Sequence, residues 1–223
     1  MKSMEGPKHP NTAPSDEDVA IQEAMSRGEF FTALELLVQQ HQDAIVRYCS
    51  CHLSDGEMAQ EIAQEVFLAA FEGMARFRGD ASVKTWLYNI AANKCLEAKR
   101  THTRRMILAQ DNEDVILEHT HCAPTPPPEE LCQQARQRQL VWQALQRLRL
   151  QERDLLILRY LEEFTYAEIG AILRISSRTV ERRLPQAEAK FHRAYTRCQN
   201  GPWFRRRHTK AKPQSMQRVL AGI

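Results

Sequence analysis

The residues best suited to bind a partner molecule lie between positions 164 and 190, where polar and basic side chains follow two expected helix starts. Thr165 and Glu168 form a capping box, in which a threonine and a glutamate three residues later satisfy the first backbone donors of a helix. A turn is expected over residues 174–176, and Ser176 can cap the next helix. Two helices joined by a tight turn predict a helix-turn-helix, whose second helix enters the major groove of DNA.

The second helix of this motif offers the side chains that would contact DNA. Its apolar residues Val180, Leu184 and Ala187 repeat at helical spacing, and we expect them to face a core. The polar residues between them are expected to stay available, namely Ser177, Arg178, Glu181, Arg182 and Arg183. A plain helical hairpin with a solvated basic face is the alternative interpretation.

Charge is segregated along the chain, although the net charge is only +3. Residues 1–105 carry a net charge of −3 and residues 106–132 a net charge of −6, whereas residues 133–201 and 202–223 each carry +6. A basic C-terminal part indicates a polyanionic partner such as nucleic acid.

The sequence offers little to an enzyme or to a metal. We find no glycine-rich phosphate loop and no nucleophile elbow, so we expect no catalysis and no cofactor. Cysteine and histidine gather at residues 49–52 and 119–122, but neither cluster has the Cys-x2-Cys spacing of a zinc finger or ribbon, so we expect no metal site.

The composition also predicts where the protein acts. The N-terminus is polar and carries three prolines before residue 15, which is unlike a signal peptide. No apolar stretch reaches the roughly 18 residues that a membrane span needs. We therefore expect a cytoplasmic protein without membrane insertion, in which the six cysteines are thiols.

Apolar residues recur at helical rather than strand spacing, so the expected fold is all-α. Ser54 or Asp55 is placed to cap a helix whose apolar face includes Met58, Ile62, Val66, Leu68 and Phe71, and Ser82 is placed to cap a helix that ends near Arg105. A Pro-rich stretch without helical period separates two helical parts. The expected organisation is a disordered leader (1–15), a first domain (16–105), an acidic linker (106–132), a second domain (133–201) and a basic tail (202–223).

Two blocks of sequence resemble one family. Residues 151–160, 164–170 and 175–180 are similar to region 4 of bacterial sigma factors, and residues 62–71, 77–82 and 85–93 are similar to region 2 of the extracytoplasmic-function group. The resemblance implies two small helical domains joined by a flexible acidic linker. It also implies a function: binding core RNA polymerase and directing promoter recognition, DNA melting and transcription initiation.

The resemblance assigns partners as well. In this family the region 2 helix docks on the β′ clamp helices of polymerase, and region 4 meets the β flap and the −35 promoter element. An anti-sigma factor is an expected further partner. The residues of this chain that match the docking helix are Glu57, Glu61, Gln64, Glu65 and Leu68.

The loop after that helix and the helix beyond it match the family's −10 melting element. Melting requires a pocket for an extruded base and cations for the exposed backbone. The matching residues are Gly79, Asp80, Ala81 and Ser82 for the pocket wall, Asn89 and Asn93 for base edges, and Lys84, Lys94, Lys99 and Arg100 for phosphates. Trp86 lies four residues from Ile90 on this helix, which favours a place in the core over stacking on a base.

Three features depart from the family pattern. Glu181 stands where a basic residue is usual, and it could accept a hydrogen bond from a cytosine amino group. Pro185 lies inside the expected recognition helix and is expected to end its straight part. The tail with Arg205, Arg206 and Arg207 extends past the usual end of region 4.

Two alternatives stay open. A helix-turn-helix regulator that acts without replacing sigma would explain residues 140–200 but not the first block. A sigma-like protein that has lost promoter binding would act only as an interaction module, and Glu181 and Pro185 keep this alternative open. The acidic linker is open to two interpretations, an RNA mimic in the polymerase channel or plain disorder.

Overall fold

The computed structural model describes residues 16–53, 55–110 and 129–199, and within these ranges the chain forms helices and no strand. The first four helices are α1 (Asp16–Ser26), α2 (Phe30–His52), α3 (Gly56–Met74) and α4 (Val83–Gln110). They are followed by α5 (Glu129–Gln146), α6 (Leu150–Leu156), the π-helical turn η1 (Ile157–Leu161), α7 (Tyr166–Leu173) and α8 (Ser177–Gln199). The all-α prediction is confirmed. The predicted leader, the basic tail and most of the predicted linker lie outside the described residues.

The helix starts follow the local chemistry of the sequence. The Asp55 carboxylate accepts a hydrogen bond from the backbone N–H of Glu57 at 2.9 Å, and Ser82 Oγ accepts one from the N–H of Thr85 at 3.1 Å. Thr165 and Glu168 bond reciprocally, as the capping box predicts. Each cap satisfies backbone donors that have no partner inside the helix. The helix starts predicted at Asp55, Ser82 and Thr165 are therefore confirmed.

Two helix boundaries differ from the prediction, the end of one helix and the start of another. The helix that begins after Ser82 continues to Gln110, five residues past its expected end at Arg105, and α5 begins at Glu129, inside the predicted linker.

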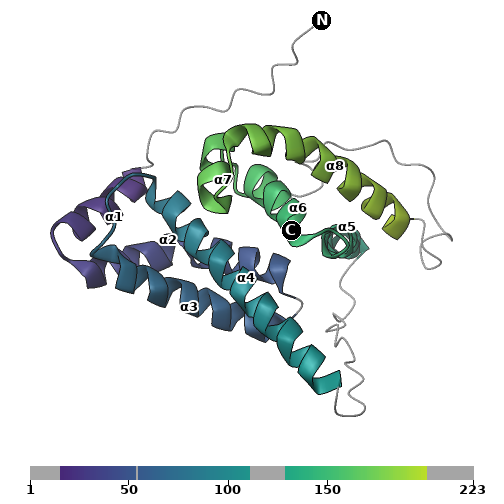
Figure 1. The fold of residues 1–223 in the computed structure, drawn as a ribbon, viewed down its shortest axis with the longest axis horizontal. Helices are drawn as coiled ribbons and strands as arrows, with labels where there is room; N and C mark the ends of the chain where they lie inside the picture. Colours follow the sequence, from purple (N-terminus) through teal and green to yellow (C-terminus); the bar gives the residue numbers. More distant parts are fainter. Residues whose placement is uncertain (1–15, 54, 111–128, 200–223) are drawn as a thin grey trace, which may run out of the picture.

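The helices form two units that pack on each other (Figure 1). We call α1–α4 the first unit and α5–α8 with η1 the second unit. Buried apolar residues of both units form one continuous core, which includes Leu37, Val66 and Leu87 from the first unit and Leu145 and Phe191 from the second. Trp86 is half-buried against this core, with its ring 5.1 Å from that of Phe77, which confirms its predicted place.

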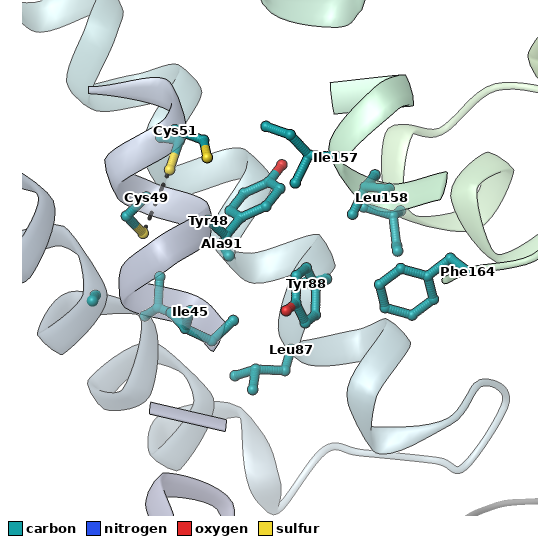
Figure 2. Packing of buried hydrophobic residues seen from close by; sticks show 14 of the residues in the cluster. Ile45, Tyr48, Cys49, Cys51, Leu87, Tyr88, Ala91, Ile157, Leu158 and Phe164 are labelled. Atoms are coloured by element: carbon teal, nitrogen blue, oxygen red, sulfur yellow. Dashed lines mark hydrogen bonds between the residues drawn. The ribbon is translucent and has the colours of Figure 1, made fainter. Parts of the chain in front are cut away.

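Figure 2 shows the place where the units meet, which we call the junction. Tyr48 and Tyr88 of the first unit point toward Ile157, Leu158 and Phe164 of the second. The Tyr88 and Phe164 rings meet edge to face, with centroids 5.0 Å apart. Edge-to-face contact adds to the free energy gained from burying the rings.

The turn between α7 and α8 depends on a glycine. A Cβ added to Gly170 would lie 2.7 Å from the carbonyl oxygen of Ile175, a backbone atom that cannot move away without displacing the turn. The first residue of the turn, Arg174, takes a left-handed conformation with φ 55°, which lets the backbone reverse toward α8.

We predict that Gly170→Ala destabilises the protein by about 2 kcal/mol, since overpacking costs roughly 1–3 kcal/mol. Gly56→Ala is the matched control, because a Cβ there meets nothing within 4 Å. Urea unfolding followed by circular dichroism measures both variants. Equal stability of the two variants would show that the turn is not as tight as described.

Candidate nucleic-acid interface

The helix-turn-helix is formed by α7 and α8, and its second helix presents polar side chains as the spacing predicts. Ser176 Oγ accepts a hydrogen bond from the N–H of Thr179 at 3.2 Å, so it caps α8. Val180, Leu184 and Ala187 are buried, which confirms the predicted core face. Arg178, Glu181 and Arg182 are exposed and, with Ser176 and Thr179, line a surface hollow at the start of α8.

One side chain of the second helix differs from expectation. Arg183 is half-buried, with its Nη1 3.4 Å from Gln151 Oε1, so it is less available than Ser177, Arg178 and Arg182.

Pro185 lies inside the recognition helix and does not end it. Helix α8 runs unbroken from Ser177 to Gln199 with Pro185 inside it. Pro185 is exposed, whereas Leu184 and Ala187 beside it are buried. The carbonyl of Glu181, which loses its helical donor, lies on the same exposed side, where water can bond to it. Burial of the opposite face therefore holds the helix together across the proline.

The predicted melting residues on α4 are bound to the second unit. Asn89 Nδ2 donates hydrogen bonds to the backbone oxygens of Ile172 at 2.9 Å and of Ala171 at 3.3 Å, at the end of α7. Lys84 Nζ donates to the Glu162 carbonyl at 2.9 Å and lies 4.8 Å from the centre of the Phe164 ring. These two side chains therefore hold the second unit in this structure.

The other predicted melting residues lie apart from that contact. Asn93 is exposed and donates to the Asn89 backbone oxygen at 2.8 Å, and Lys94 pairs with Glu65 at 3.0 Å. In the loop before α4, Gly79 has φ 76°, a left-handed backbone that favours glycine, and Asp80 pairs with Arg78 at the surface. Ala81 and Ser82 are half-buried, and Arg100 and Lys99 are exposed.

The predicted docking helix α3 presents both acids and apolar side chains to solvent. Glu57, Glu61 and Gln64 are exposed, and Glu65 is held by its ion pair with Lys94. Leu68 is 59% exposed, so it lies outside the buried face of α3, which includes Val66 and Phe67, and it stays available as a docking residue.

Leu68 belongs to an exposed apolar patch whose other members, Phe31 and Phe71, were not predicted from the sequence as interaction residues. Phe31 on α2 is 76% exposed, and its ring lies 5.3 Å from that of Phe71 on α3. Leu68 and Phe71 lie three residues apart on one helix face. We call Phe31, Leu68 and Phe71 the α2–α3 patch. Uncovered aromatic and aliphatic side chains that gather in this way mark an interaction surface.

Sequence reasoning also missed a set of buried polar side chains at the junction. Glu162 as a whole residue is 5% exposed, and its carboxylate accepts hydrogen bonds from Arg47 Nη2 at 3.0 Å and from the Tyr88 hydroxyl. The Asp154 carboxylate accepts one from the Tyr48 hydroxyl at 2.7 Å. Burial and the adjacent carboxylates raise the pKa of Tyr48 and of Tyr88 well above its usual range, so both hydroxyls keep the proton that they donate.

Arg153 is the most deeply buried of these charged residues, at 1% exposure. Its Nη1 donates to the backbone oxygen of Cys51 at 2.8 Å, at the end of α2, and its Nε donates to that of Leu145 at 2.9 Å, in α5. The sequence signal for this group was a charged pair, Arg153-Asp154, directly before an apolar run, where solvated residues would be out of place.

The cysteines of the described residues are buried thiols, namely Cys49, Cys51, Cys95 and Cys198. The Sγ atoms of Cys49 and Cys95 are 3.7 Å apart, and burial raises the pKa of Cys51 to about 12. Thiols with so high a pKa stay protonated and react slowly. Among the described residues no three metal-ligating side chains gather, and the cluster at 119–122 lies outside them. No described helix is long and apolar enough to cross a membrane.

Comparison with known proteins supports the pattern of two blocks. Residues 37–105 match the family model for Sigma-70 region 2, and residues 138–191 match that for Sigma-70, region 4. The two matches together span more than half of the chain and occur in the order that the sequence predicts. The chain belongs to the extracytoplasmic-function group of the sigma-70 family.

Similar proteins bear names that agree with this family. The RNA polymerase sigma-H factor of Pseudomonas aeruginosa is 29% identical over 183 residues, which are 80% of this chain and 94% of that protein. The RNA polymerase sigma factor YlaC of Bacillus subtilis is 28% identical over 165 residues, 74% of this chain and 93% of that protein. The ECF RNA polymerase sigma-E factor of Escherichia coli K12 is 28% identical over 174 residues, 76% of this chain and 90% of that protein.

Two solved structures share the fold at 21% sequence identity. One is CnrH in complex with the cytosolic domain of CnrY, with a TM-score of 0.56 over 80% of this chain and 96% of that one. The other is the sigma factor RpoE in complex with the anti-sigma factor NepR from Bartonella quintana, with a TM-score of 0.59 over 73% of this chain and 96% of that one.

Membership of this family shows the general function of the chain. This sigma factor binds core RNA polymerase and directs promoter recognition, DNA melting and the start of transcription. A helix-turn-helix regulator that acts without replacing sigma is not favoured, because it leaves the region 2 match at residues 37–105 unexplained.

The continuous α8 yields a test of its own. We predict that Pro185→Ala stabilises this sigma factor by up to about 3 kcal/mol, because alanine restores a helical hydrogen bond and removes the clash of the proline ring. The neighbouring exposed Gln186, changed to alanine, is the matched control. Urea unfolding measures both variants, and a Pro185→Ala variant no more stable than Gln186→Ala would show that α8 is broken at Pro185.

Proposed function

We propose that this sigma factor divides its work among three surfaces: α3 with the α2–α3 patch for core polymerase, the 79–93 segment for the −10 element, and the start of α8 for the −35 element. It has no catalytic activity of its own in this proposal and acts in the cytoplasm, where core polymerase is found. The observation that carries the proposal is the α2–α3 patch, because it joins exposed apolar side chains to the acids of the docking helix.

The docking surface combines two kinds of contact. Phe31, at 76% exposure, and Leu68, at 59%, supply apolar area that only a partner can remove from water. Glu57, Glu61 and Gln64 are exposed on the same helix, α3, and precede Leu68 at helical spacing, so they flank this area with polar groups. An apolar centre with a polar rim is the usual anatomy of a protein interface. The β′ clamp helices of polymerase are the proposed occupant.

The melting surface is assigned to the loop and the first turns of α4. Gly79, Asp80, Ala81 and Ser82 border the place proposed for an extruded base, with Asn89 and Asn93 offering hydrogen bonds to its edges. The proposed phosphate contacts are Lys84, Lys94 and Arg100. Asn93 and Arg100 are exposed already, whereas Asn89 and Lys84 must first leave the second unit.

The −35 surface is assigned to the first two turns of α8. Ser177, Arg178 and Arg182 are exposed and can reach base edges or phosphates, and Arg183 follows them from a half-buried position. Glu181 is exposed among these cations and can accept a hydrogen bond from a cytosine amino group. Because α8 continues past Pro185, the reading face is not shortened at that residue.

An anti-sigma factor is proposed as a further partner. The similar fold of RpoE was solved with its anti-sigma factor NepR. The α2–α3 patch of this chain would be a suitable target for such a protein, because covering it would deny polymerase the same apolar surface.

The docking assignment predicts the effect of a double substitution. We expect Glu61→Lys with Leu68→Ser to weaken binding to core polymerase at least about tenfold, which corresponds to roughly 1.4 kcal/mol. Biolayer interferometry with immobilised core polymerase measures the affinity, and run-off transcription should fall in parallel at limiting sigma concentration.

Asp43→Lys is the control for that experiment, because Asp43 is an exposed acid on α2 outside the proposed surface. Circular dichroism checks that each variant keeps its helices. If the double variant binds core polymerase as tightly as Asp43→Lys does, polymerase docks elsewhere on the chain.

A further inference from the structure

The start of α4 has two roles: it contacts the second unit, and it belongs to the surface proposed for promoter DNA. Lys84, Tyr88 and Asn89 on the first turns of α4 all bond to the segment from Glu162 to Ile172. Two of them, Lys84 and Asn89, belong to the surface proposed for promoter DNA. The second unit therefore occupies groups that single-stranded DNA would need.

Glu162 is the acid on which this contact centres. Its carboxylate is 4% exposed, and both groups that bond to it, Arg47 and Tyr88, come from the first unit. Its backbone oxygen accepts from Lys84, also of the first unit. A buried carboxylate is stable only while such partners compensate its lost hydration. If the units separate, Glu162 returns to water and loses all three.

The neighbouring backbone explains why Glu162 reaches the junction. The π-helical turn ends with the Glu162 N–H bonded to the Ile157 oxygen at 3.1 Å, and the Phe164 N–H bonds to the Leu158 oxygen at 2.9 Å. Glu163, between them, has φ 60°. This tight reversal turns Glu162 and Phe164 toward α4 and leaves Glu163 exposed.

We propose that Glu162 is an intramolecular latch, which holds the second unit on the first so that the free sigma factor withholds Asn89 and Lys84 from DNA. The proposal rests on the proposed function, because that is where these two residues are assigned to the −10 element. Single-stranded DNA and the 162–172 segment of the second unit compete for the Asn89 amide and the Lys84 ammonium group. Opening of the junction is therefore coupled to DNA binding, and weakening the latch strengthens DNA binding.

The latch leaves the docking surface free. Phe31 and Leu68 are exposed in the closed chain, so polymerase can bind there before the units separate. The two steps, docking and release of α4, thus use different groups and can be changed separately by substitution.

Glu162→Gln keeps the shape of the side chain and removes the charge that Arg47 compensates, so it tests the latch directly. Its matched control is Glu163→Gln, the same change at the adjacent exposed residue. Small-angle X-ray scattering of the free chain measures the radius of gyration. Fluorescence anisotropy with a fluorescein-labelled single strand of about 12 nucleotides measures DNA binding, since such a length spans the usual site of single-strand binders.

We expect Glu162→Gln to have a larger radius of gyration than the wild type and to bind the single strand about tenfold more tightly, as loss of a charged hydrogen bond allows. Glu163→Gln should match the wild type in both measurements. Identical behaviour of the two variants would overturn the latch. A larger radius without tighter DNA binding would support closure by Glu162 but contradict the DNA role assigned to Asn89 and Lys84.

Tyr88→Phe provides a second variant from the other side of the contact. The ring stays against Phe164, and only the hydroxyl that donates to Glu162 is lost. We expect a smaller change in the same direction, and little further change when it is added to Glu162→Gln, because the two groups act as one pair. Additive effects of the two substitutions would contradict a shared latch. This second test holds even if Glu162→Gln lowers the stability of the second unit.

Discussion

Charge buried between the two units is the constraint on which the rest of this structure depends. A guanidinium or carboxylate removed from water must find hydrogen-bond partners, and a charge left alone costs several kcal/mol. Arg153 finds them in the carbonyl groups of Cys51 and Leu145, Asp154 in Tyr48, and Glu162 in Arg47 and Tyr88. Every one of these three charges takes at least one partner from the first unit. The second unit thus has its buried charges compensated only when it lies on α2 and α4.

This dependence links fold to function. Hydrophobic burial alone would hold two helical units together in many orientations, because apolar contact is not directional. The buried hydrogen bonds select the orientation in which α7 ends over Asn89 and Glu162 lies beside Tyr88. In the proposed latch, the same bonds also withhold Asn89 from DNA until the two units separate.

Local rules predicted the parts of the structure that are local. The caps at Asp55, Ser82 and Thr165 depend on a few adjacent residues, and so does the spacing of Val180, Leu184 and Ala187. The family resemblance rested on similarly short blocks. Local rules did not predict the parts that distant contacts decide: Asn89 is bound to the end of α7, and α8 passes Pro185 while its other face is buried. Pairs such as Arg47 with Glu162, 115 residues apart, leave no periodic trace in a single sequence.

The most direct test of this account is whether the two units touch in the free protein. Nuclear Overhauser effects between the rings of Tyr88 and Phe164, with selectively labelled tyrosine and phenylalanine, report on a contact of 5.0 Å between ring centres. The account predicts strong cross-peaks between these rings in the isolated chain and their weakening in Glu162→Gln. Absence of the cross-peaks from a folded wild-type chain would contradict it, because the buried charges of the second unit would then lie in water.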